Sequence, residues 1–223
     1  MSLGPEREGV IKFVCRYRPG PPLEAHHLAD INAWRKILFQ LELIGCVAHR
    51  YEGLGFGNIS RRLPASREEG AAGFVISGTQ TGGLADLEPH HYAIVSFCDP
   101  QANLVDSLGP IKPSSESLTH GILYQLDPRV SCVLHVHSPH IWRAAQVLEL
   151  PVTGADVPYG TPAMAAEVRR LCLEKSLLPQ GVLVMGGHED GVLAFGPDFT
   201  SAGTALVACL ARAYAVGQGR AGT

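Results

Sequence analysis

Short strand-like segments recur through most of the 223-residue chain and alternate with helical segments, which restricts the fold more than any other feature. Turn-forming residues bound the strand-like segments, which we expect at residues 10–17, 58–63, 74–77, 92–97, 103–107, 130–137, 182–185 and 192–195. Apolar residues three or four apart predict helices at residues 28–44, 113–126, 138–148, 161–175 and 199–213. We therefore predict one α/β domain over residues 1–223, in which helices cover a mainly antiparallel sheet.

Capping and turn residues mark several of these boundaries. Ser138-Pro139 and Thr161-Pro162 each place an N-cap residue before a proline at the first helical position. Asp190-Gly191, between the last two strands, is typical of a hairpin. Residues 65–73 are small or charged, and we expect them to form an exposed loop.

Charge, hydropathy and cysteine spacing argue against several classes of protein. The net charge is −3, so no basic footprint points to a nucleic acid. We expect no membrane span, because no apolar run approaches about 20 residues, and no signal peptide, because the N-terminus lacks basic and apolar regions. The six cysteines show no CxxC spacing and are typical of reduced core thiols, so we expect a cytoplasmic protein.

Three histidines form the first candidate site. His135 and His137 are two residues apart on a predicted strand, so their imidazoles point to the same face. His188 follows an apolar strand and Gly186-Gly187, which let the backbone pass close to another segment. A catalytic zinc site commonly has three protein ligands and one open position. The alternative is a set of buried polar histidines that other groups satisfy, and on this pattern alone both interpretations stand.

Other histidines compete for the role of ligand. His140 lies on the helix after Ser138-Pro139 and is expected to face away from His135. The adjacent pairs His26-His27 and His90-His91 have diverging side chains, so we interpret them as solvated surface residues.

A second group of residues surrounds Glu116, which lies near the start of a predicted helix. The helix dipole alone is enough to explain an acidic residue there. Ser114 and Ser115 precede it and offer hydroxyls and free backbone N–H groups, which suit a phosphate. Gly57-Asn58 and Ser77-Gly78 place further small residues beside short strands.

The order of these motifs resembles the class II aldolase/adducin family from about residue 28 to 215. The segments that carry the resemblance are Gly57-Asn58-Ile59-Ser60, Ile76-Ser77-Gly78, Pro113-Ser114-Ser115-Glu116, His120, Val133-Leu134-His135-Val136-His137-Ser138 and His188. The resemblance implies a three-layer α/β/α domain with a mainly antiparallel central sheet, often assembled as a homotetramer. It also implies Zn²⁺, or another divalent metal ion, on His135, His137 and His188, with Glu116 as the acid/base and Tyr159 as a second catalytic residue. The substrate phosphate is then expected on Gly57, Asn58, Ser77, Gly78, Ser114 and Ser115.

The implied activity is that of a metal-dependent lyase of the aldolase type, acting on a small sugar phosphate or related hydroxy-carbonyl compound through an enediolate. Epimerisation or dehydration on the same scaffold is an alternative, and epimerases of this family tend to carry Asp where this chain has Glu116. A non-catalytic, adducin-like interaction domain is a further alternative. The chain departs from the family pattern at Glu189 and Asp190, which add negative charge beside His188, and at its C-terminus, where we expect no tail that supplies a tyrosine.

Overall fold

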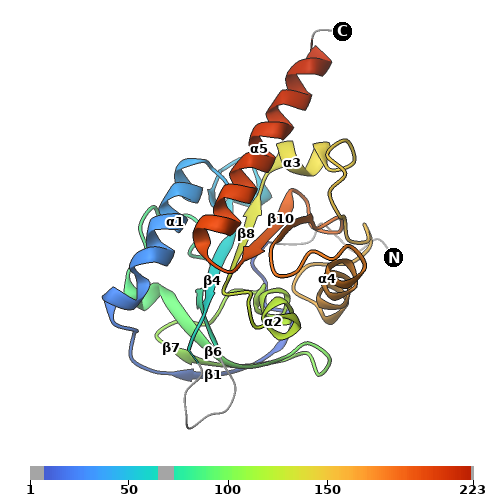
Figure 1. The fold of residues 1–223 in the computed structure, drawn as a ribbon. Helices are drawn as coiled ribbons and strands as arrows, with labels where there is room; N and C mark the ends of the chain where they lie inside the picture. Colours follow the sequence, from blue (N-terminus) through green and yellow to red (C-terminus); the bar gives the residue numbers. More distant parts are fainter. Residues whose placement is uncertain (1–7, 65–72, 222–223) are drawn as a thin grey trace.

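The computed structural model describes residues 8–64 and 73–221, so most of the predicted loop at 65–73 lies outside the described residues. Eight strands form one sheet in the order β1-β7-β6-β5-β4-β8-β10-β9 (Figure 1). Its strands are β1 Val14–Pro19, β4 Asn58–Arg62, β5 Phe74–Ser77, β6 Tyr92–Asp99, β7 Leu104–Gly109, β8 Cys132–His137, β9 Gly181–Val184 and β10 Gly191–Gly196. A separate two-stranded ribbon pairs β2 (Gly45–Cys46) with β3 (Gly55–Phe56).

The sheet is mainly antiparallel, as predicted. Among the described strands only β1 and β7 pair in parallel. The register places Asn58 of β4 and Leu193 of β10 on either side of His135 in β8. The central strand therefore carries the candidate histidines between two neighbours that fix it on both edges.

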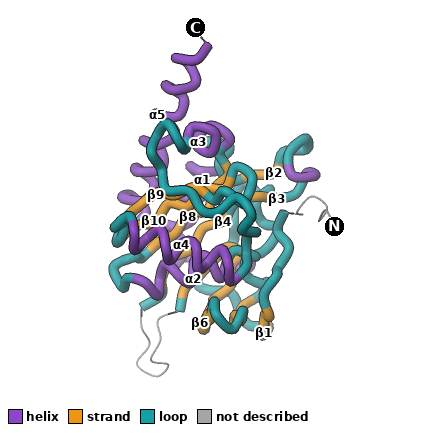
Figure 2. Tube along the Cα trace, turned by 90° about the vertical axis from the view of Figure 1, so that its right-hand side faces the viewer, coloured by secondary structure: helices purple, strands orange, loops and turns teal. Residues whose placement is uncertain are grey.

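Helices cover both faces of the sheet, which gives the three-layer arrangement that the family resemblance implied. The α-helices are α1 Ala29–Gln40, α2 Ser117–Leu126, α3 Pro139–Ala144, α4 Pro162–Glu174 and α5 Phe199–Ala221. Single 3₁₀ turns occur at Ala25–Leu28, Tyr51–Gly53 and Pro89–His91. Figure 2 shows α1, α3 and α5 on one side of the sheet and α2 and α4 on the other.

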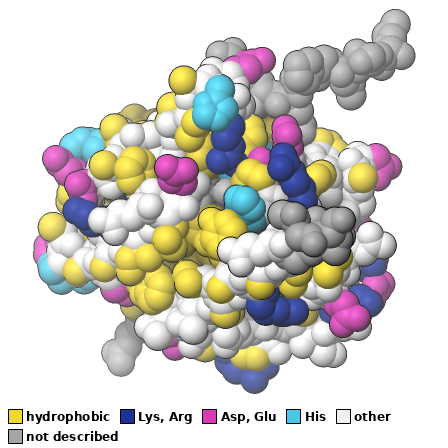
Figure 3. All heavy atoms as spheres, turned by 90° about the horizontal axis from the view of Figure 1, so that it is seen from above, with side chains coloured by type: hydrophobic (Ala, Val, Ile, Leu, Met, Phe, Trp, Pro, Cys, Tyr) yellow, Lys and Arg dark blue, Asp and Glu magenta, His cyan; other side chains and the backbone are white. Residues whose placement is uncertain are grey.

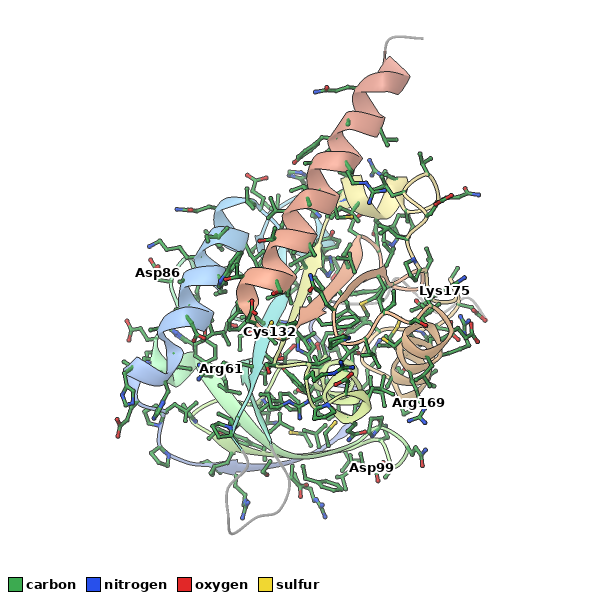
Figure 4. The ribbon with its side chains drawn as sticks, in the orientation of Figure 1. Arg61, Asp86, Asp99, Cys132, Arg169 and Lys175 are labelled. Carbon is green, nitrogen blue, oxygen red and sulfur yellow. The ribbon has the colours of Figure 1, made fainter. Side chains whose placement is uncertain are left out.

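Two hydrophobic cores, one on each face, result from the alternation along the strands. In β8, Leu134 and Val136 join the core beneath α1 and α5, whereas Val133 joins the core beneath α2 and α4. His135 and His137 alternate with the first pair, so both point toward α2 and α4, as the two-residue spacing predicted. On the opposite face Arg61 of β4 reaches α1 and donates to Asp30 Oδ1 at 3.0 Å (Figure 4).

Several predicted boundaries were wrong by a few residues at the N-terminal side. The strand predicted at 10–17 begins at Val14, because the preceding residues cross to another part of the molecule instead of pairing with β7. The helix predicted to reach residue 44 ends at Gln40. Leu43 and Ile44 continue the apolar pattern because both are buried. Their N–H groups, however, both donate to Leu38 O, at 2.9 and 3.3 Å, instead of continuing the helical hydrogen-bond pattern.

Two other helices are shorter than predicted. α2 begins at Ser117, not near residue 113, because Ser114 forms a turn ahead of it: its Oγ accepts from Glu116 N at 3.2 Å. α3 ends at Ala144, and residues 145–148 continue as turns. The predicted N-caps are confirmed, since Ser138 Oγ accepts from Ile141 N and Thr161 Oγ1 from Met164 N, both at 3.3 Å.

The last helix corrects the expectation that no apolar run approaches a membrane-spanning length. Within α5, the segment Phe199–Gln218 has 20 residues and, by length and composition only, is long and apolar enough to cross a membrane. The buried side chains of this helix pack on the sheet, among them Ala202, Leu206 and Leu210. Its C-terminal half projects from the body of the molecule in Figure 1.

Candidate metal centre

Three buried histidines meet at one end of the central strands. His135 and His137 come from β8, and His188 comes from the loop between β9 and β10. His137 Nε2 and His188 Nε2 are 3.1 Å apart, and the three ring centroids are separated by 4.7 to 5.2 Å. One nitrogen from each ring lies within 4.8 Å of the others, which is close enough for a single metal ion to join them.

Close backbone packing turns His188 into this cluster. A Cβ on Gly187 would lie 2.0 Å from Val157 O, so only glycine permits this approach. The loop then closes through a hydrogen bond from Gly191 N to His188 O at 2.9 Å. Asp190 has a φ of 62°, which completes the predicted hairpin between β9 and β10.

Burial keeps the three imidazoles neutral. It lowers the pKa of His135 to about 4 and holds the pKa values of His137 and His188 well below the usual range. Within the described chain, neither ring nitrogen of His135 has a hydrogen-bond partner, and neither does Nδ1 of His137. Buried polar atoms without partners are costly, and neutral imidazole nitrogens are good ligands for divalent metals. The donor set therefore fits such an ion.

The same pKa shifts predict how the metal-free protein responds to acid. In the unfolded chain histidine has a pKa near 6.5, whereas folded His135 has one of about 4. Between these values the unfolded state binds more protons, so the free energy of unfolding falls as pH falls. For His135 alone the loss is about 3 kcal/mol by pH 4, and His137 and His188 act in the same direction. Urea unfolding in the presence of a chelator measures this loss of unfolding free energy.

The exposed histidine His26 provides the control for that experiment. Its replacement by glutamine changes an exposed histidine outside the cluster, and the slope between pH 6.5 and 4 is compared with that of the wild type. A flat stability profile across this range would contradict the neutral, buried state of the cluster.

A small cavity beside the histidines brings together most of the predicted phosphate-binding residues. It is lined by Glu8, Gly9, Gly55, Gly57, Asn58, Gly78, Thr79, Gln80, Thr81, Gly82, Ser114 and Ser115. Ser77 is the exception among the predicted set, because its Oγ accepts from Ile59 N at 3.2 Å and it does not line the cavity. Asn58 Oδ1 is buried and has no partner within the described residues.

Gly57, which lines this cavity, packs closely against its neighbours. Its φ is +75°, and a Cβ there would lie 3.1 Å from His135 O. A larger residue would therefore push β8 and the turn before β4 apart.

Glu116 lies at the N-terminus of α2 and is 1% exposed. Thr119 Oγ1 donates to its Oε2 at 2.8 Å. One turn later His120 Nδ1 and Ser60 Oγ are 2.6 Å apart, which ties α2 to β4. The start of α2 is thereby held against the face of the sheet that carries the histidines.

Tyr159 is buried next to His188, and their ring centroids are 4.5 Å apart. Its neighbour Gly160 contacts Ser115, since a Cβ on Gly160 would lie 2.7 Å from Ser115 O. The Tyr159 loop therefore connects the third histidine to the segment that leads into Glu116.

Asp190 is linked to the histidine cluster through Tyr51, a role that the sequence pattern did not reveal. Its Oδ2 accepts from Tyr51 Oη at 2.6 Å and from Arg50 at 3.3 Å. The Tyr51 ring meets His137 edge-on at 4.7 Å between centroids. Glu189, by contrast, is exposed. Only the general acidity near His188 hinted at this arrangement, because Arg50 and Tyr51 lie far away in the sequence.

The remaining candidates lie elsewhere. His140 is exposed and contacts Tyr214, so it faces away from the cluster as predicted. A second group of possible ligands, Glu24, His26 and His27, is exposed. All six cysteines are free.

A larger cavity of about 750 Å³ lies away from the histidines, among α2, α4 and the turn after β6. Asp99 and Arg169, which line it, are labelled in Figure 4. It shares no residue with the histidine site. On the face shown in Figure 3, charged side chains of both signs are interspersed.

Fold and site together define a mixed α/β protein with a candidate metal centre. Residues 46–214 match the family described as "Class II Aldolase and Adducin N-terminal domain". The chain belongs to this family, which confirms the resemblance drawn from its motifs.

Relatives with curated names include methylthioribulose-1-phosphate dehydratases. The one from Xanthomonas euvesicatoria pv. vesicatoria is 35% identical over 85 residues, which are 37% of this chain and 32% of that protein. The one from Leptospira biflexa serovar Patoc is 34% identical over 82 residues, or 37% of this chain and 36% of that protein. The matched part thus spans about a third of each relative's length.

Solved structures resemble the chain over most of its length. L-fuculose-1-phosphate aldolase from Thermus thermophilus has a TM-score of 0.63 at 19% identity and covers 88% of this chain and 95% of its own. A sugar-phosphate aldolase from Thermotoga maritima has a TM-score of 0.62 at 15% identity, with coverages of 87% and 94%. At these identities the likeness establishes the fold.

Proposed function

We propose that this protein is a metal-dependent lyase that acts on a small sugar phosphate or related hydroxy-carbonyl compound. The observation that carries the proposal is the cluster of three buried, neutral histidines beside the buried Glu116 and a cavity lined mainly by glycine, serine and threonine residues. Lyases that break a bond next to a carbonyl need a site for negative charge and a group that moves a proton. This arrangement offers both.

His135, His137 and His188 would hold Zn²⁺ or another divalent ion, and three protein ligands leave a position open for substrate. When bound, the ion would act as a Lewis acid toward the substrate's carbonyl oxygen.

The chain's own residues bind and orient the substrate. Ser114 and Ser115 precede α2, where the helix dipole favours an anion. Asn58 adds a polar side chain from β4 with an atom still available for a hydrogen bond. We therefore assign the phosphate group to this cavity.

Glu116 is the proposed proton carrier and Tyr159 a second catalytic residue. In aldol cleavage the hydroxyl on the second carbon from the carbonyl gives its proton to Glu116, and the bond between the first and second carbons from the carbonyl breaks. The electron pair moves toward the carbonyl oxygen, and an aldehyde leaves. Glu116 then delivers a proton to the carbon next to the carbonyl, which completes the ketone product.

Dehydration is the second candidate reaction, and the identity to methylthioribulose-1-phosphate dehydratases favours it. Here a proton leaves the carbon next to the carbonyl and hydroxide leaves the following carbon. Incubation with fuculose 1-phosphate and with methylthioribulose 1-phosphate, followed by mass spectrometry, distinguishes aldol cleavage from dehydration. Cleavage gives two smaller fragments, whereas dehydration gives one product lighter by a single water. If neither cleavage nor dehydration products form from either compound, the result argues against both reactions.

The proposed anion cavity makes its own prediction. Inorganic phosphate should raise the melting temperature of the wild type, because a ligand that binds only the native state stabilises it. The Asn58→Ala, Ser115→Ala double variant should lose most of this gain. Thermal melts with and without phosphate measure it.

Thr161→Ala serves as a control, because it removes a helix cap outside the cavity and should lower both melting temperatures without changing the phosphate effect. Equal stabilisation of the wild type and the double variant would count against the cavity as the anion site.

We further propose that the protein works in the cytoplasm as a homo-oligomer, with the tetramer common in the family as the expected state. Light scattering of the purified protein tests the assembly, and a monomer at micromolar concentration would oppose it.

A further inference from the structure

A buried arginine of α1 holds the loop after β5, which forms one wall of the small cavity beside the histidines. Arg35 is 2% exposed, and its guanidinium donates to Thr81 O and Gly82 O at 3.1 Å and to Ala85 O at 2.9 Å. Thr81 O also accepts from Leu84 N at 3.1 Å, which closes a β-turn. Thr81 and Gly82 both line the cavity. Arg35 therefore fixes the part of the loop that borders the proposed anion site.

The orientation of the two carbonyl groups decides where the neighbouring N–H groups point. In a trans peptide the C=O and N–H of one group point in opposite directions. The carbonyls of Thr81 and Gly82 face Arg35. The N–H groups of the same two peptides belong to Gly82 and Gly83, so they point away from the arginine. Both nitrogens lie beside Gly55, which also lines the cavity: a Cβ on Gly55 would be 3.1 Å from Gly82 N and 3.2 Å from Gly83 N.

These N–H groups are suited to an anion. Within the described residues neither Gly82 N nor Gly83 N donates to another backbone group, and successive N–H groups in a turn form a site that attracts negative charge. Asn58, which is 7% exposed, lines the same cavity, and its Oδ1 has no hydrogen-bond partner in the described part of the chain. Hydrogen bonds in series strengthen one another, so the positive charge of Arg35 behind the turn makes both N–H groups better donors.

We propose that Arg35 is a positioning residue for the substrate phosphate, which holds the turn so that Gly82 N and Gly83 N donate to the anion. This inference rests on the proposed function, which assigns a phosphate group to this cavity. Arg35 itself would not touch the substrate, because the turn lies between them. In this loop the phosphate-binding residues expected from the family resemblance ended at Gly78, so both donors are additional to that set.

The first test observes the turn in the wild-type protein by nuclear magnetic resonance. The chain contains two Thr-Gly pairs, Thr81-Gly82 and Thr153-Gly154. Threonine labelled with ¹³C at the carbonyl, combined with glycine labelled with ¹⁵N, therefore selects the amide signals of Gly82 and Gly154 alone. Saturating inorganic phosphate should move the Gly82 amide proton downfield. The Gly154 signal is the internal control and should stay in place, because its N–H donates to Glu167 Oε2 at 3.0 Å and it does not line the cavity.

The second test separates positioning from general stabilisation. Isothermal titration calorimetry with inorganic phosphate compares Arg35→Met and Arg35→Lys with the matched variant Arg62→Met. Arg62 also donates to three backbone carbonyls, those of Tyr124, Asp127 and Val130, but it lies outside this cavity. Both methionine variants should have lower melting temperatures. Arg35→Met alone should bind phosphate about tenfold more weakly, the effect of losing one or two hydrogen bonds, and Arg35→Lys should lose less because it keeps the charge.

The outcomes distinguish this inference from the proposed function. A Gly82 signal that stays in place while phosphate binds would overturn the role of Arg35 and leave the anion cavity standing. Wild-type phosphate affinity in Arg35→Met, or an equal loss of affinity in Arg62→Met, would do the same. If Arg35→Met does not fold, the Gly82 signals of the wild type and of Arg35→Lys decide the question. A wild type that binds no phosphate would overturn the anion cavity together with the role of Arg35.

Discussion

Replacing His135, His137 or His188 with alanine is expected to remove the metal from the protein. The wild type should hold about one divalent ion per chain, and each variant should hold less than about a tenth of that after dialysis, because two ligands do not make a closed zinc site. The three nitrogens lie within 4.8 Å of one another, so no single ring is peripheral to the cluster. Elemental analysis of the dialysed proteins measures the effect.

His140→Ala is the matched control for that series. His140 lies three residues after His137, but its side chain is exposed and contacts Tyr214. It should therefore retain the metal at the wild-type level. A stoichiometric ion in the triple variant of His135, His137 and His188 would show that the metal is held elsewhere.

The second large effect is expected from Glu116→Gln. The substitution should keep the metal, because the three histidines hold it, and it should keep substrate binding, because amide and carboxylate have nearly the same shape. Turnover should fall by about a hundred-fold or more, which is the usual scale for a lost general acid or base. Metal content, substrate affinity and single-turnover rates of the same preparation separate these effects.

Thr119→Ala refines this prediction. Thr119 donates a hydrogen bond to Glu116 Oε2, so its loss should misalign the carboxylate and lower turnover less than Glu116→Gln does. If Glu116→Gln loses the metal yet recovers full turnover when metal is resupplied, Glu116 supports the metal and carries no proton. The mechanism proposed here would then be wrong.

Local patterns in the sequence predicted much of the fold and part of the candidate site. The two-residue spacing of His135 and His137 requires a shared face on any strand, and β8 provides it. Gly186-Gly187 indicated a close backbone approach, which Val157 and Thr153 supply. These features depend on a few neighbouring residues, so the sequence expresses them directly.

Features that depend on distant partners could not be predicted in this way. Glu8 lies 129 residues before His137 in the sequence. Its carboxylate comes close to the His137 ring only because the segment that carries it leaves the edge of the sheet. The support of Asp190 by Arg50 and Tyr51 likewise joins two separate turns. Tyr51 also has a positive φ of 49°, which no residue preference would indicate.

Helix ends were misplaced for a related reason. Leu43 and Ile44 keep a helical spacing because tertiary packing buries them, although the backbone has already left the helix. The serines before Glu116 also looked helical, but Ser114 uses its hydroxyl and carbonyl oxygens to form a turn. The spacing of apolar residues therefore indicates which side chains are buried. It indicates a helix only where the buried residues also belong to one.

Transfer of deuterium from solvent tests the central claim most directly. The zinc-loaded protein is incubated in heavy water with fuculose 1-phosphate, methylthioribulose 1-phosphate and dihydroxyacetone phosphate, and proton magnetic resonance follows the hydrogen on the carbon next to the carbonyl. We predict that at least one of these compounds loses this hydrogen or is converted to product. The reaction should stop on chelation and should be restored by metal in the wild type but not in Glu116→Gln. A protein that holds one metal ion per chain and yet neither exchanges nor converts any of the three compounds would contradict the proposed chemistry and favour a binding role.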